Sequence, residues 1–110
     1  MTAVNRPGVD GHGHQAERVV VILNRYGLHA RPAAEFVKLS SRFASKVTVE
    51  KDGLEVNGKS IMGVMMLAAE CGSELTIRTT GEDADEALEA LSRLVSNRFG
   101  ETDADYEIGN

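Results

Sequence analysis

The twelve residues KVTVEKDGLEVN, at positions 46–57, carry the clearest fold signal in the chain. Val47 and Val49 alternate with polar residues, which is typical of a strand with one buried face. Asp52 and Gly53 come next, and both residue types accept the positive φ of a two-residue hairpin turn. The last four residues of the stretch then return along the first strand, so the segment predicts an antiparallel β-hairpin.

Two more strands are expected, one on each side of this hairpin in the sequence. Residues 18–23 form a continuous apolar, mostly β-branched run after Arg18, which favours a strand that is central in a sheet or buried on both faces. Residues 74–80 alternate again and place Leu75, Ile77 and Thr79 on one face. The sequence therefore predicts four strands.

Helical patterns separate the strands. Apolar residues recur at three- and four-residue steps over positions 33–43, and Pro32 suits a first helical turn, so a helix should begin beside His29 and end near position 43. A short, Met-rich helix is expected at 61–69, with Ser60 at its N-cap.

A third helix is predicted from the stripe of Ala, Leu and Val that follows Asp83. Asp83 and Glu86 resemble a capping box, and Gly100 suits the C-terminal cap. The element order is then βαββαβα, an α+β chain in which hairpin turns favour antiparallel pairing and the helices gather on one face.

The length of 110 residues favours one domain. The polar segment 1–16 lacks an apolar period and is expected to be a mobile N-terminal arm, and 101–110 is expected to be a loose acidic tail. The folded domain is accordingly placed at 17–100.

Charge and composition exclude several classes of function. Lys and Arg total 12 against 17 for Asp and Glu, a formal net charge of -5, and there are no Trp and few other aromatic residues, so no nucleic-acid partner is expected. The apolar runs fall well short of the ~20 residues that span a bilayer, so no membrane insertion is expected. Cys71 is the single cysteine and is expected to be an ordinary buried thiol; with no secretory leader, a cytoplasmic location fits best.

The chemically suggestive segment is Gly27 to Pro32, which places the imidazole of His29 immediately before a helix. Unpaired amides and the positive end of the dipole make a helix start favourable for anions. Arg31 adds a guanidinium that matches phosphate geometry. A phosphoryl group on His29 could be held there, but the spacing alone favours a capping histidine beside a solvated arginine.

GLHARPA at 27–33, VNGKSIMGVMML at 56–67 and the closing amphipathic helix together resemble the HPr family of histidine phosphocarrier proteins, from about position 18 to 99. The resemblance implies an HPr-like open-faced β-sandwich with a four-stranded antiparallel sheet and three helices on one face. It also implies that His29 accepts phosphate on Nδ1 from phosphoenolpyruvate through enzyme I and passes it to sugar-specific IIA components. Arg31 matches the family's phosphate-contacting arginine. Such a protein is a relay rather than an enzyme, and needs no cofactor or metal.

Ser60 matches the serine that HPr kinase/phosphorylase modifies in many family members, and it can serve as a helix N-cap at the same time. Ile61, Met62 and Met65 lie where the family presents an apolar docking patch, and we expect these side chains to be partly exposed. The main alternative is a regulatory phosphoprotein that controls carbon metabolism through Ser60 without a role in sugar transport. Retention of His29 and Arg31 favours the carrier.

Two weaker alternatives remain. The Met-rich helix could be an oligomer interface, although a monomer is expected. His12 and His14 could bind a metal, but two ligands on a mobile arm make a weak site, so no metal is predicted.

Overall fold

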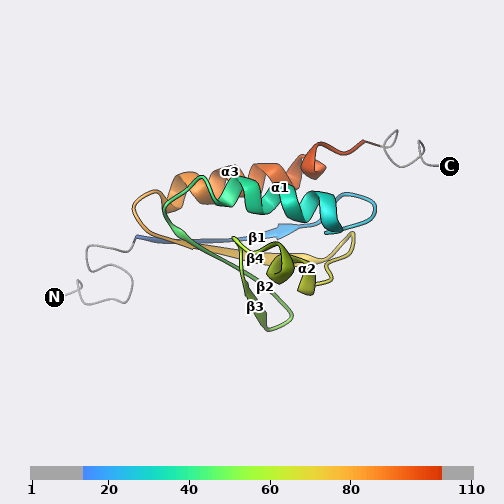
Figure 1. Ribbon diagram of the computed structural model, residues 1–110, viewed down its shortest axis with the longest axis horizontal. Helices are drawn as coiled ribbons and strands as arrows, with labels where there is room; N and C mark the ends of the chain where they lie inside the picture. Colours follow the sequence, from blue (N-terminus) through green and yellow to red (C-terminus); the bar gives the residue numbers. More distant parts are fainter. Residues whose placement is uncertain (1–13, 103–110) are drawn as a thin grey trace.

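The computed structural model describes residues 14–102 and has the expected βαββαβα order (Figure 1). Its elements are β1 (Gln15–Val21), α1 (Ala30–Ser40), β2 (Lys46–Lys51), β3 (Leu54–Asn57), α2 (Ile61–Met66), β4 (Glu74–Thr80), α3 (Ala84–Ser96) and the short 3-10 helix η1 (Arg98–Gly100). Residues 1–13 and 103–110, which carry most of the expected arm and tail, lie outside the described residues.

The four strands form one antiparallel sheet in the order β1-β4-β2-β3. The hairpin between β2 and β3 turns at Asp52 and Gly53, whose φ values of 51° and 86° confirm the predicted turn. β4 lies between β1 and β2, so the last strand in the sequence pairs with both the first and the second. This topology confirms the predicted four-stranded antiparallel sheet.

The prediction that the first strand is central or buried on both faces is wrong. β1 is an edge strand that pairs only with β4, and the side chain of Val19 is 56% exposed whereas Ile22, just past the strand, is fully buried. A β-branched run fits a pleated, half-buried surface and does not by itself require burial of both faces. The strand also begins at Gln15, so the folded domain reaches two residues into the segment expected to be a mobile arm.

Helices α1 and α3 lie over the same face of the sheet, and α2 packs against α1 and β3 (Figure 1). The apolar side of each element closes on one core, as the two- and 3.6-residue periods require. The fully or almost fully buried side chains at its centre include Ile22, Phe36, Val47, Val49, Val64, Leu75, Ile77, Leu91 and Val95. Among residues 14–102 no helix has the length and apolar character needed to cross a membrane.

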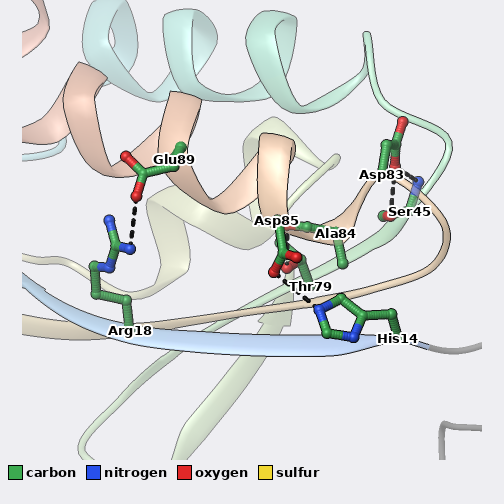
Figure 2. Close-up of polar contacts among 8 residues, drawn as sticks. All are labelled: His14, Arg18, Ser45, Thr79, Asp83, Ala84, Asp85 and Glu89. Carbon is green, nitrogen blue, oxygen red and sulfur yellow. Dashed lines mark hydrogen bonds and ion pairs between the residues drawn. The ribbon is translucent and has the colours of Figure 1, made fainter.

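Polar contacts fasten α3 to the strands beneath it (Figure 2). Arg18 in β1 donates to Glu89 at 2.8 Å, and this contact holds the pKa of the Glu89 carboxyl below its ordinary value. The ring of His14 lies 2.9 Å from a carboxylate oxygen of Asp85. In β4 the hydroxyl of Thr79 donates to the carbonyl of Ala84. These contacts fix the edge strand and the last helix relative to each other.

The predicted capping box at Asp83 is wrong. Asp83 occupies the N-cap position of α3 but makes no capping bond; its carboxylate accepts the amides of Ala44 and Ser45, both at 2.9 Å, and the Ser45 hydroxyl (Figure 2). The carboxylate thus ties the start of α3 to the loop before β2. Tertiary donors compete successfully for an oxygen that sequence alone assigns to its own helix.

Three further expectations need correction. α1 ends at Ser40, earlier than position 43, and the chain continues in tighter turns in which the amides of Arg42 and Phe43 donate to the carbonyls of Leu39 and Ser40. α2 also ends early, at Met66. Cys71 is exposed, not buried, since it lies in the loop before β4.

Candidate functional site

The loop that leads to His29 is locked against the segment that follows α2. Gly27 has φ of 70° there, and a Cβ atom at this position would collide with the carbonyl oxygen of Ala69. The amide of Leu28 donates to the same carbonyl at 2.9 Å, and its side chain is 5% exposed. The contacts of Gly27 and of the buried Leu28 therefore fix the position of the backbone just before His29.

His29 is the N-cap residue of α1, which confirms that the helix begins beside it. Its ring makes no capping bond to the helix, and its side chain is 41% exposed. Pro32 has no N–H, and the amide of Ala33 donates to the carbonyl of His29 at 3.0 Å. The amides with no partner inside the helix are therefore those of His29, Ala30 and Arg31, one fewer than an ordinary helix start offers.

The carboxylate of Glu101 contacts the side chains of His29 and Arg31 at this helix start. Its Oε2 lies 3.1 Å from Nε2 of His29 and 2.8 Å from Nη1 of Arg31. The Glu101 side chain is only 3% exposed. The expectation that the chain becomes a loose tail at position 101 is therefore wrong for this residue, which is a buried part of the candidate site.

Asn24 holds the other oxygen of that carboxylate. Its Nδ2 donates to Oε1 of Glu101 at 3.2 Å and to the carbonyl of Gly27 at 2.7 Å, so one amide joins the last residue of the site to the loop before His29. Asn24 is fully buried, and its Oδ1 has no partner among residues 14–102. Sequence reasoning assigned Asn24 only to a strand end.

An unusual backbone turn carries Glu101 to this position. Arg98, Phe99 and Gly100 have φ values of 60°, 55° and 77°, so three successive residues lie in the left-handed region. Only glycine adopts that region without steric cost. The Phe99 side chain is 3% exposed and anchors the turn in the core. The strained geometry is thus held by burial, and it directs the next residue back towards α1.

The predicted partners His29 and Arg31 are brought together through Glu101, which sequence reasoning missed. An ionised carboxylate can only accept hydrogen bonds, so the ring nitrogen that faces it donates; in the neutral ring the other nitrogen, Nδ1, then has the lone pair. The Arg31 side chain is 54% exposed, so its remaining donors are accessible. No local pattern could have shown Glu101, because it lies 72 residues from His29.

Ser60 lies at the start of α2 rather than at the His29 site. Its side-chain oxygen accepts the amide of Gly63 at 3.0 Å, which confirms the predicted N-cap. Next to it, the side chains of Ile61, Met62 and Met65 are 43%, 75% and 41% exposed, as expected. Met66 is exposed as well, and we call these four residues the α2 apolar patch.

The described residues give no support to a metal site. Among positions 14–102 no three His, Cys, Asp or Glu side chains form a group that could hold an ion. His14 pairs with Asp85 instead, and His12 lies outside the described residues.

Comparisons with known proteins find consistent similarity to phosphocarrier proteins. Residues 16–97 match the model of the PTS HPr component phosphorylation site. The phosphocarrier protein HPr of Cupriavidus necator is 49% identical over 85 residues, which cover 77% of this chain and 96% of that protein. The HPr-like protein Crh of Halalkalibacterium halodurans is 52% identical over 79 residues, or 72% of this chain and 94% of that protein. A crystal structure of HPr from Thermoanaerobacter tengcongensis superposes with a TM-score of 0.77 at 46% identity, covering 79% of this chain and 98% of that one.

Proposed function

The chain belongs to the HPr family of the phosphotransferase system, and from that premise we propose that His29 is the residue that carries the phosphoryl group. The protein would accept the group from phosphoenolpyruvate through enzyme I and pass it to sugar-specific IIA components. The observation that best supports this proposal is the half-exposed His29 ring at the start of α1, with Nε2 held by a buried carboxylate.

The transfer needs a nucleophile that can also leave. The lone pair on Nδ1 of His29 attacks phosphorus, a P–N bond forms, and the bond between phosphorus and the donor breaks with its electron pair remaining on the donor. In the second transfer the acceptor attacks phosphorus and the P–N electron pair returns to Nδ1. Phosphoryl transfer of this kind depends mainly on positioning and on stabilisation of the oxygens' charge.

Arg31 would supply part of that stabilisation. Its guanidinium has five N–H donors, and the contact with Glu101 uses Nη1, so donors remain for phosphate oxygens. The amides of Ala30 and His29 and the positive end of α1 add partial charges of the same sign. The protein finishes no turnover by itself, so we assign it as a relay rather than an enzyme.

Partners would dock on the α2 apolar patch. Met side chains adapt to different surfaces, which suits a protein that must meet enzyme I and several IIA components in turn. We propose that the protein acts in the cytoplasm and as a monomer.

A second candidate function is regulation through Ser60, and the similarity to an HPr-like protein Crh favours it. Ser60 lies beside the patch, so a phosphate added by an HPr kinase/phosphorylase would place about two negative charges next to Ile61 and Met62. In this scheme regulation and carriage coexist in one protein. A purely regulatory protein would not need the contacts that hold His29 and Arg31.

The deciding experiment is incubation of the full chain with phosphoenolpyruvate and enzyme I, followed by mass measurement before and after acid treatment. We expect one acid-labile phosphoryl group in the wild type and none in His29→Ala. His14→Ala is the matched control and should still be phosphorylated. A wild-type protein that stays unmodified, or a His29→Ala protein that still gains an acid-labile group, would overturn the assignment.

A further inference from the structure

We propose that Glu101 is a positioning residue that keeps the ring proton of His29 on Nε2 and thereby presents Nδ1 as the reacting nitrogen. The inference rests on the proposed function, since positioning matters only if His29 reacts. It assigns a role to a residue that follows the last helix, where no chemistry was expected from the sequence.

The contacts of the Glu101 carboxylate define this role. Oε2 accepts hydrogen bonds from His29 Nε2, at 3.1 Å, and from Arg31 Nη1, at 2.8 Å. Oε1 accepts one from Nδ2 of Asn24. Each of these groups approaches the carboxylate as a donor. Rotation of the His29 ring by 180° about Cβ–Cγ would place Cε1 instead of Nε2 against Glu101 and lose the hydrogen bond, so the carboxylate selects a ring orientation as well as a proton position.

The carboxylate can act as a fixed reference because it cannot easily move. The Glu101 side chain is 3% exposed, Asn24 is fully buried, and Phe99 anchors the left-handed turn just before Glu101. A solvent-exposed carboxylate would lose much of its influence to screening. Burial limits this screening, and two further donors hold the carboxylate in one orientation.

With Nε2 of His29 hydrogen-bonded to Glu101, the ring proton does not have to move during phosphoryl transfer. When Nδ1 forms its bond to phosphorus, the proton on Nε2 stays in place and the ring becomes cationic. The Glu101 carboxylate then faces a positive ring, which strengthens the contact. When the phosphoryl group leaves, the electron pair returns to Nδ1 and the proton is still on Nε2. Both transfers thus start from a ring that needs no rearrangement.

The test compares Glu101→Ala with Glu101→Gln, which keeps an acceptor oxygen. The first measurement uses the unphosphorylated full chain with ¹⁵N-labelled histidine, at a pH where the ring is neutral, and reads the His29 tautomer from the ring nitrogen shifts. We expect one dominant tautomer, protonated on Nε2, in the wild type and in Glu101→Gln. In Glu101→Ala we expect a mixture.

The second measurement is the rate of His29 phosphorylation by enzyme I. Loss of a carboxylate that orients a metal-binding histidine typically costs 10- to 100-fold, and by analogy we expect roughly a tenfold decrease in Glu101→Ala and substantial rescue in Glu101→Gln. Glu89→Ala is the matched control, because it removes a carboxylate that pairs with an arginine elsewhere on the domain. It should leave both the tautomer and the rate as in the wild type.

The outcomes separate this inference from the proposed function. Unchanged tautomer populations in Glu101→Ala would overturn the positioning role whether or not the protein is phosphorylated. A changed tautomer with an unchanged phosphorylation rate would also overturn it, because the orientation would then not matter for transfer. A wild type that shows the expected tautomer but takes no phosphate would instead overturn the proposed function, and with it the role of Glu101 in transfer, while the effect of Glu101 on the ring proton would stand.

Discussion

The first two helices of this domain begin at polar residues whose side chains are held by different parts of the chain. Ser60 at the start of α2 is held by its own helix, through the amide of Gly63 three residues away. His29 at the start of α1 makes no bond to its helix and is held by Glu101 from beyond the end of α3. One start has a local side-chain cap, whereas the other has no side-chain capping bond and its ring is oriented by a residue outside the helix.

This difference shows which contacts leave a helix start able to bind an anion. A side chain that satisfies the first amides removes the donors that an anion would use. A ring that is fixed from another direction leaves those donors in place. By this criterion the start of α1 is arranged for group transfer and the start of α2 for stability, and mutations at the two ends should have effects of different kinds.

The largest effect is expected at Arg31, apart from loss of the nucleophile itself. Arg31→Ala removes a charge-assisted contact worth about 1.5–3 kcal/mol, so phosphorylation of His29 should slow by about 10- to 100-fold. Arg31→Lys should rescue only part of the rate, because lysine keeps the charge but not the planar fork. Arg31→Ala should still fold but unfold at a somewhat lower temperature than the wild type, because it removes one donor from the buried Glu101 carboxylate, whereas Arg31→Lys keeps a cation near that carboxylate. Equal transfer rates in all three proteins would contradict the role.

The next effect is expected from phosphate on Ser60. Like charge or forced desolvation at an apolar contact costs several kcal/mol, so the modified protein should be phosphorylated on His29 at least about tenfold more slowly at subsaturating concentration. The measurement compares protein modified by an HPr kinase with the unmodified protein. Ser60→Asp should show the same direction with a smaller change. A rate unaffected by the phosphate would leave Ser60 with its capping role only.

A smaller effect is expected when the cap itself is removed. Ser60→Ala should lower the free energy of unfolding by ~1 kcal/mol and leave the rate of His29 phosphorylation near wild type. Ser60→Asn is the matched variant, because it retains an oxygen that can accept the amide of Gly63. Denaturant unfolding of the three proteins measures the difference. A slowed transfer with unchanged stability would mean that Ser60 contributes to docking rather than to capping.

The features that the sequence predicted well are those fixed by neighbouring residues. The β2–β3 hairpin, the Ser60 cap and the exposure of Met62 each depend on a few consecutive positions. The features it missed depend on distant partners, because Glu101 meets His29 across 72 residues and Asp83 meets Ser45 across 38. The edge position of β1 was also missed, since strand order is decided by tertiary packing and not by the composition of one strand.

The start of α3 offers the last and smallest test of the comparison, because Asp83 neither caps its helix nor faces a ligand. Hydrogen bonds from the Ser45 hydroxyl, and then from the amide of Ala44, hold the pKa of Asp83 below its ordinary value of 3.8. A carboxyl whose pKa is lowered on folding stabilises the protein above its unfolded-state pKa, and this contribution is lost as the pH falls through the folded-state value.

We therefore expect the wild type to lose stability as the pH is lowered from about 5 through 3.8 and below, with Asp83 responsible for part of the loss. In Asp83→Asn the free energy of unfolding should be lower at pH 7 and should change less over that acid range, while His29 phosphorylation at neutral pH stays near wild type. Ser45→Ala removes the first of the donors and should give a weaker version of the same result, whereas the double variant should add little to Asp83→Asn, because the two residues share one contact. Urea unfolding at a series of pH values measures all four proteins. If Asp83→Asn shows the same acid dependence as the wild type, the contact between α3 and the loop before β2 does not stabilise the fold through the charge of Asp83, and α3 would be held by its apolar face and the contacts to β1 and β4 alone.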